Sequence, residues 1–208
     1  MRERALHPFG QSWAFLATGA DSGLRFSLRD RLRAETAGKH REVDDAFSSL
    51  DLRDALDLGA FCRANVSLLH AVRILPGRHH DHAKALRAEM QDALVADLRH
   101  LGAEPASFLP RRRIDGTSAL YILLGSRAGT RLLHRRWQTT RDPTVTGAGP
   151  YLGLDGEAKA WRRFCEELGQ IPSHSERSDV VVRDAGAMFD LYLAGFTANT
   201  PKTGVLHV

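Results

Sequence analysis

The stretch LLGSRAGTRLL (residues 123–133) places two glycines, Gly125 and Gly129, within an apolar run of helical character. Each glycine inside a helix costs about 0.5–1 kcal/mol relative to alanine, because its unfolded backbone has more conformational freedom to lose. Residues four apart share one helix face, so both glycines present bare backbone on the same side. The pattern predicts a helix that lies against a flat, bulky ligand, or against a second helix through small residues.

The rest of the chain carries apolar residues at intervals of three or four, which predicts an all-α fold. A first helix is expected to begin at Ser27, which forms a capping-box pattern with Asp30. Ser173 and Glu176 form a second such pattern ahead of the last helix. The brief run DVVVR (residues 179–183) is the only strand-like segment in the sequence. We therefore predict about six helices, expected near residues 27–47, 58–75, 83–101, 114–137, 161–168 and 176–196.

The 208 residues suffice for one domain with a continuous core. We expect a single helical bundle at residues 27–199, with a flexible extension at 1–26 and a tail at 200–208. No apolar stretch approaches the length of a membrane span, and Pro8, Gln11 and Ser12 interrupt the approach to the short apolar patch at residues 13–20. Cys62 and Cys165 each fall in a helical apolar pattern, which predicts buried free thiols and a cytoplasmic protein.

The chain is basic, with a formal net charge of +4 and a pI near 9.4. Residues 111–142 contain eight arginines and two aspartates. Such a basic face is suited to nucleic acid, an acidic protein or an anionic small molecule. No nucleic-acid recognition motif accompanies the charge, so we expect no nucleic-acid partner.

One cluster of histidines and one single histidine are candidate metal ligands. The cluster RHHDH (residues 78–82) sits at the start of a predicted helix, where only His79 and His82 would share a face, so a solvated surface is favoured. His40 lies instead on the apolar stripe of the first predicted helix. Asp44, one turn later, could accept a hydrogen bond from its Nδ1 and direct its Nε2 toward iron. A core histidine bonded to a carboxylate explains the same two residues without a ligand.

Two segments together resemble the heme oxygenase family, in particular its bacterial biliverdin-producing branch. LRAETAGKHREVD (residues 32–44) is similar to the family's first helix, with its histidine followed four residues later by an acidic residue. LYILLGSRAGTRLL (residues 120–133) is similar to the helix on the other side of the heme, where a tyrosine precedes a Gly-Ser-x-x-Gly core. Weaker likeness at residues 160–168 and 184–196 extends the resemblance over residues 28–196.

The resemblance implies that heme lies between the first and fourth predicted helices, with His40 as the axial ligand of its iron. It assigns the oxygen site to Gly125, Ser126 and Gly129, and the other contacts with heme to Arg33, Val43, Asp44, Tyr121 and Arg162. The mammalian branch has an aspartate where this chain has Ser126. Serine is usual there in the bacterial branch, and the water network must then be organised differently.

The implied activity is oxidative cleavage of heme to biliverdin, carbon monoxide and ferrous iron with O2. No flavin or nicotinamide fingerprint is present, so electrons would come from a reductase or ferredoxin docked on the basic face. The alternative is a heme-binding or heme-delivery protein of the same fold without turnover. A di-iron oxidase is disfavoured because the chain has no repeated Glu-x-x-His pairing. We expect a monomer or weak dimer, with no membrane partner.

Overall fold

The computed structural model describes residues 26–154 and 158–200. It is mostly helical, which confirms the predicted all-α class. The expected N-terminal extension and C-terminal tail lie outside the described residues, apart from one residue at each border. The described elements are, in chain order, α1 (Leu28–Ser48), α2 (Ala55–Ala71), β1 (Val72–Ile74), α3 (His80–His100), β2 (Arg112–Ile114), α4 (Gly116–Trp137), α5 (Pro143–Gly147), α6 (Pro150–Gly153), α7 (Ala158–Gly169) and α8 (Glu176–Asn199).

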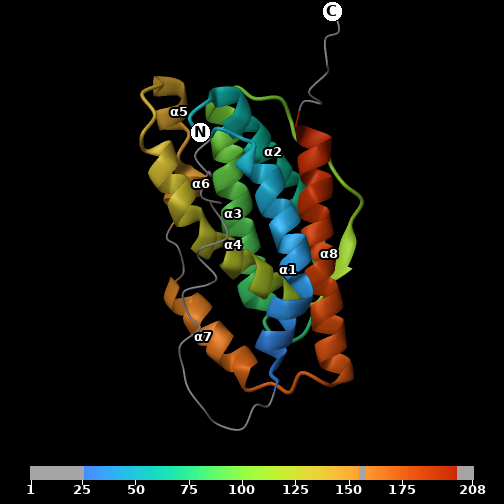
Figure 1. Ribbon diagram of the computed structural model, residues 1–208. Coiled ribbons are helices and arrows are strands. Elements are labelled where there is room, and N and C mark those ends of the chain that lie inside the picture. The colour runs from blue at the N-terminus through green and yellow to red at the C-terminus, as the bar shows by residue number, and fades with distance from the viewer. Residues whose placement is uncertain (1–25, 155–157, 201–208) are drawn as a thin grey trace, which may run out of the picture.

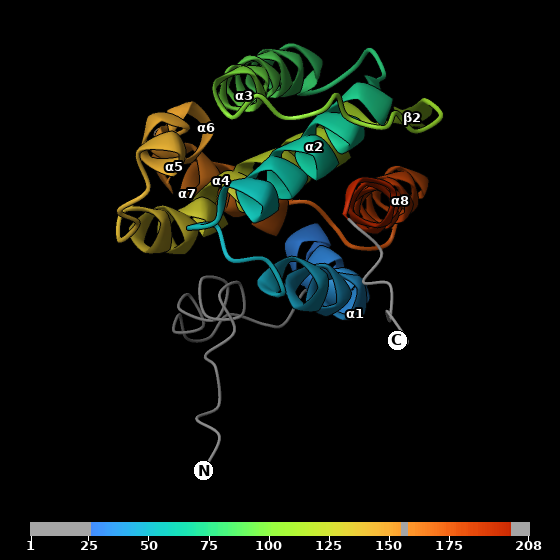
Figure 2. The ribbon, with the colours of Figure 1, turned by 90° about the horizontal axis from the view of Figure 1, so that it is seen from above.

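The long helices form a bundle around α2 and α8 (Figure 1). α8 packs against α1 and α2, α2 also packs against α3, and α4 contacts both α3 and α8. Seen from above, α1 and α3 lie on opposite sides of α2 (Figure 2). Gly195 makes the α2–α8 contact close, because a Cβ atom there would come within 2.7 Å of the Ala64 carbonyl oxygen. Such a distance is below van der Waals contact, so a side chain would push the helices apart.

The start of α1 confirms the predicted capping box. The Ser27 hydroxyl accepts a hydrogen bond from the Asp30 backbone N–H at 3.3 Å, and the Asp30 carboxylate accepts one from the Ser27 N–H at 3.1 Å. Both bonds satisfy backbone donors that the first turn of a helix leaves without a partner. The apolar stripe of this helix faces the core, and Leu32, Val43 and Phe47 are buried.

The second predicted capping box is wrong. α8 begins two residues later than the box requires, since Ser175 is its N-cap and accepts from the Ser178 N–H at 3.1 Å. Ser173 is buried, and its backbone N–H donates to the Phe26 carbonyl at 3.3 Å. The chain before α8 thus pairs with the segment that leads into α1, which removes Ser173 from the helix end.

The prediction of a helix through residue 75 is wrong at its end, where the chain forms the first of two three-residue strands. α2 ends at Ala71, and β1 pairs with β2 in parallel, with Val72 opposite Arg112 and Ile74 opposite Ile114. β-branched side chains favour the extended backbone, which explains why the helix ends where Val72 begins. The strand-like run at residues 179–183 is helical and belongs to α8.

The predicted chain break after α4 contains the short helices α5 and α6. Tyr151 of α6 is buried, and its backbone N–H donates to the Asp97 carboxylate of α3 at 3.0 Å. Arg127 of α4 is 1% exposed and donates to the carbonyl oxygens of Tyr151, at 3.0 Å, and Leu154. Two buried charged side chains therefore hold α6 between α3 and α4.

The prediction of buried free thiols is confirmed, because Cys62 and Cys165 are both buried and neither forms a disulfide. Burial raises the pKa of the Cys165 thiol to about 11, so this thiol stays protonated at neutral pH. No described helix combines the length and the apolar character that crossing a membrane requires.

Candidate functional site

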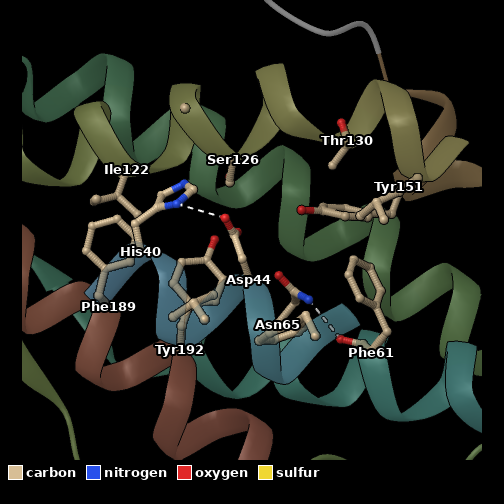
Figure 3. A pocket seen from close by; sticks show the side chains of 14 residues that line it. His40, Asp44, Phe61, Asn65, Ile122, Ser126, Thr130, Tyr151, Phe189 and Tyr192 are labelled. Carbon is tan, nitrogen blue, oxygen red and sulfur yellow. Dashed lines mark hydrogen bonds and ion pairs between the residues drawn. The ribbon is translucent and has the colours of Figure 1, made fainter. Parts of the chain in front are cut away.

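A pocket lies between α1, α4 and α8, with α2 and α6 closing its inner side (Figure 3). Its walls are mainly apolar and include Val43, Phe47, Ile122 and Phe189. The interior volume is about 50 Å³, which is room for a few water molecules. Mostly apolar walls with a few polar groups are typical of small-molecule sites.

His40 lines this pocket and confirms the pairing predicted from its spacing to Asp44. Its Nδ1 lies 3.0 Å from the Asp44 Oδ2, and the two side chains are 21% and 6% exposed. Residues four apart on a helix are neighbours, so α1 alone sets this geometry. The Phe189 ring of α8 meets the imidazole edge to face, with 5.6 Å between ring centroids. The ring of His40 is thus held from two sides.

α4 faces His40 across the pocket with a small-residue turn. Gly125 and Ser126 line the pocket, and the Ser126 hydroxyl donates to the Leu123 carbonyl at 2.9 Å. Gly129 is buried but does not line the pocket, whereas Thr130 does. The face of α4 that lines the pocket is therefore rotated relative to the predicted one. Of the two glycines, only Gly125 lies on it.

Polar groups from α2, α6 and α8 also reach the pocket, and no sequence motif predicted a functional role for them. Figure 3 shows oxygen atoms of Asp44, Tyr151 and Tyr192 directed toward the space between the helices. The Tyr192 hydroxyl is buried and forms no hydrogen bond of ordinary geometry with any described residue. Burial raises its pKa, although the nearby Ser126 acts in the opposite direction. Asn65 donates to the Phe61 carbonyl at 2.8 Å.

The structure divides the residues assigned by resemblance into two sets. His40, Val43, Asp44, Gly125 and Ser126 come together around the pocket. Tyr121 lies outside it and packs against Trp161 of α7, with 5.4 Å between ring centroids. Arg33 and Arg162 are exposed and do not line the pocket either. The charged contacts expected for heme carboxylates therefore need other partners.

A second hollow of about 470 Å³ adjoins the pocket and shares Phe47 and Leu133 as walls. Arg53, Arg135 and Arg136 line it. Arg53 is held by Asp51, with 2.8 Å between the guanidinium and the carboxylate. Among the described residues, no carboxylate forms an ion pair with Arg135 or Arg136. The apolar pocket thus opens at one end toward cationic side chains.

The eight arginines of residues 111–142 do not form one face. Arg112 and Arg113 belong to β2, which precedes α4, whereas Arg135 and Arg136 lie in the last turn of α4. A helix of 22 residues spans roughly 33 Å at 1.5 Å per residue, so these groups lie at opposite ends (Figures 1 and 2). Arg127 is buried between them. A docking partner would meet one group or the other.

The RHHDH segment is less solvated than predicted. His79 is partly buried, with its Nε2 3.1 Å from Glu167 Oε1 and its ring edge against Phe164 of α7. Burial lowers the pKa of His79, which Glu167 partly offsets. His82 is exposed, as expected. Within the described residues, no group of three or more histidine, cysteine or carboxylate side chains is placed to hold a metal ion.

A scan against protein-family models finds no match for this chain, and a search of the curated proteins finds none either. An imidazole held by a carboxylate, apolar walls and arginines at one end fit an amphipathic iron porphyrin in chemistry. The interior of about 50 Å³ is too small for a macrocycle as it stands. Because α1 packs mainly on α7 and α8 and has little direct contact with α4, outward movement of α1 would widen the pocket.

Proposed function

We propose that this protein binds heme between α1 and α4 and is a heme oxygenase that produces biliverdin, carbon monoxide and ferrous iron. The observation that carries the proposal is the His40–Asp44 pair, at 3.0 Å, on the wall of an apolar pocket opposite Gly125. A histidine that donates its second ring N–H to a carboxylate is the usual arrangement of a metal-binding imidazole. When bound, heme would supply both the redox-active iron and the ring that is oxidised.

Asp44 determines which ring nitrogen of His40 carries a proton. By accepting a hydrogen bond from Nδ1, the carboxylate keeps the proton on that nitrogen and makes Nε2 the coordinating atom. Asp44 is almost fully buried, so its charge acts on the imidazole with little screening by solvent. Phe189 packs against the ring and limits its rotation.

Gly125, Ser126 and Tyr192 shape the opposite side of the site. The absence of a side chain at Gly125 leaves space between the α4 backbone and a bound macrocycle. The Ser126 hydroxyl donates to its own helix, so its oxygen remains an acceptor toward the pocket. The buried Tyr192 hydroxyl supplies a donor on the same side. Together these two hydroxyls can hold a water molecule and deliver a proton where the mammalian branch uses an aspartate.

The carboxylate end of the ligand is assigned to the arginine-lined hollow. Heme carries two carboxylates at one edge, and guanidinium groups bind carboxylates through paired hydrogen bonds. Arg135 and Arg136 lie beyond Phe47 and Leu133, the walls that the hollow shares with the apolar pocket. Electrons would come from an external reductase or ferredoxin. A docking step on exposed arginines would slow as ionic strength rises.

A non-catalytic heme-binding or heme-delivery protein is the second candidate function. It is favoured by the composition of the α4 wall, where the lining residues Ile122, Gly125, Ser126, Thr130 and Leu133 include no carboxylate. Without a charged group to organise water, heme could bind and remain intact. The two candidates share the binding site and differ in turnover.

Hemin titration followed by absorption spectroscopy tests the binding step. The wild type should give a saturable Soret band, and His40→Ala should lose that spectrum or weaken binding by at least tenfold. His82→Ala, which removes an exposed histidine on α3, is the matched control and should bind as the wild type does. Identical spectra for His40→Ala and the wild type would overturn the assignment of the iron ligand.

Turnover separates the two candidate functions. The hemin complex is mixed with ascorbate or a ferredoxin–reductase pair in air. Loss of the Soret band with growth of biliverdin absorption and carbon monoxide release identifies the oxygenase. A Soret band that persists under both reductants identifies the binding protein and contradicts the proposed activity.

A further inference from the structure

A separate basic hollow of about 260 Å³ lies between β1, α3 and the segment that leads into β2. It shares no lining residue with the proposed heme pocket. Four cationic side chains and two histidines line it together with Val72 and Ile74, namely Arg73, Lys84, Arg87, Arg111, His70 and His80. No carboxylate is among the residues that line it.

The fold gathers these charges from three elements. His80, Lys84 and Arg87 are spaced by four and three residues at the start of α3, so they lie on one helix face. Arg73 is the exposed central residue of β1, between buried Val72 and partly buried Ile74. Arg111 precedes β2, which the parallel pairing with β1 brings alongside. The sequence separates these residues by up to 38 positions (73 to 111).

Two buried nitrogen atoms of the hollow's side chains have no hydrogen-bond partner among the described residues. The Arg87 guanidinium donates through Nη1 to the Leu69 carbonyl at 3.0 Å, but its Nε is buried without a partner. The Nδ1 of His70 is likewise buried and without a partner. An unsatisfied buried polar group costs about 1–3 kcal/mol. The protein's own acceptors therefore satisfy the Arg87 guanidinium only in part.

The electrostatics also favour an anion. Burial and the neighbouring Arg111 both lower the pKa of Arg87, so its charge is poorly compensated. Asp81, in the first turn of α3, interacts with His80 through Nδ1 at 2.9 Å. The α3 N-cap, His79, makes no side-chain hydrogen bond to the helix. The backbone donors of its first turn therefore add to the positive potential at this end.

We propose that this hollow binds a small molecule that carries phosphate groups, with the phosphate oxygens among Lys84, Arg87 and Arg111. Phosphate matches the site because it offers several acceptor oxygens and more than one negative charge. Its volume of about 260 Å³ suits a small anion rather than a nucleic-acid backbone. Phe108 packs against His70 at a tilt of 36°, with 4.2 Å between ring centroids, and is 61% exposed. Its outer face is available to an aromatic base next to the phosphates.

Isothermal titration calorimetry with pyrophosphate and with adenosine diphosphate tests the site on the full chain. Saturable binding is expected, and Lys84→Ala and Arg111→Ala should each weaken it by about tenfold, as expected for the loss of one charged hydrogen bond. Both side chains are exposed, so their removal should leave the fold intact, which circular dichroism checks. Arg99→Ala, at an exposed position of α3 outside the hollow, is the matched control and should bind as the wild type does.

Comparing pyrophosphate with adenosine diphosphate shows which part of the ligand the hollow binds. Equal affinities assign the binding to the phosphate groups alone. Tighter binding of adenosine diphosphate that is lost in Phe108→Ala places the base on that ring. No binding of either anion, or binding that Lys84→Ala and Arg111→Ala leave unchanged, would overturn the proposal. The outcome is independent of heme binding, because the two sites share no residue.

Discussion

At the scale of single residues, the pair His40 and Asp44 shows what local spacing can determine. A histidine and an aspartate four positions apart on a helix meet wherever the helix packs, and the observed 3.0 Å contact needs nothing from the rest of the fold. Arg127 shows the opposite case. Its sequence neighbours suggested a basic surface, yet it is buried, because carbonyl groups of Tyr151 and Leu154 accept its hydrogen bonds. The sequence around Arg127 does not predict these acceptors, because they lie far from it along the chain.

Asp44→Asn tests whether the carboxylate acts through His40. The amide oxygen can still accept from Nδ1, but the negative charge is lost and the imidazole becomes a weaker electron donor. Hemin affinity should fall by about tenfold, the lower end of the range for such supporting residues. Resonance Raman spectra of the reduced complex should show a lower iron–histidine stretching frequency. Glu42→Gln, at an exposed position of the same helix, is the control, and an unchanged stretch in Asp44→Asn would argue for a merely structural pair.

At the scale of elements, sequence patterns predicted the long helices and missed the short ones. α1, α3 and α4 match their predicted ranges closely, because each carries a long periodic apolar stripe. β1 and β2 have three residues each and depend on pairing across about forty positions, so neither segment shows a period of its own. The same holds for α6, which contributes Tyr151 to the pocket and is fixed by Asp97 and Arg127.

The Asp97 carboxylate that anchors α6 should make the unfolding free energy depend on pH. Burial raises the pKa of Asp97 to about 6 from its ordinary value of 3.8. Because the folded state favours the protonated form, this group lowers the unfolding free energy as pH rises from about 4 to about 6. Two pKa units correspond to about 3 kcal/mol. Asp97→Asn should abolish that loss, so that the variant gains stability relative to the wild type between pH 4 and pH 7.

Urea denaturation at pH 4, 5.5 and 7 measures this effect. Asparagine retains an oxygen that can accept from the Tyr151 N–H, so the α3–α6 hydrogen bond should survive the change. Asp92→Asn, at an exposed position of the same helix, corrects for the loss of a surface charge. A constant difference between Asp97→Asn and the wild type at all three pH values would show that Asp97 does not titrate in this range.

At the scale of the whole molecule, only part of the candidate site can be predicted from the sequence. The two helices that face each other, α1 and α4, carry the motifs that predicted the site. The contributions of Phe189 and Tyr192 depend on how α8 packs against α1. The orientation of the site along α4 is also a property of the fold. It places Arg135 and Arg136, rather than Arg33 and Arg162, next to the apolar pocket.

This orientation predicts which arginines bind the carboxylates of heme. The double variant Arg135→Ala/Arg136→Ala should weaken hemin binding by about tenfold or more, since charged hydrogen bonds contribute about 1.5–3 kcal/mol each before solvent screening. Hemin dimethyl ester, which has no free carboxylate, should bind the wild type and this variant with similar affinity. Arg33→Ala/Arg162→Ala should keep the preference of the wild type for hemin over its ester. If instead that second variant loses the preference, the carboxylates of heme point toward the N-terminal end of α1. Arg135 and Arg136 would then be surface residues that do not bind heme.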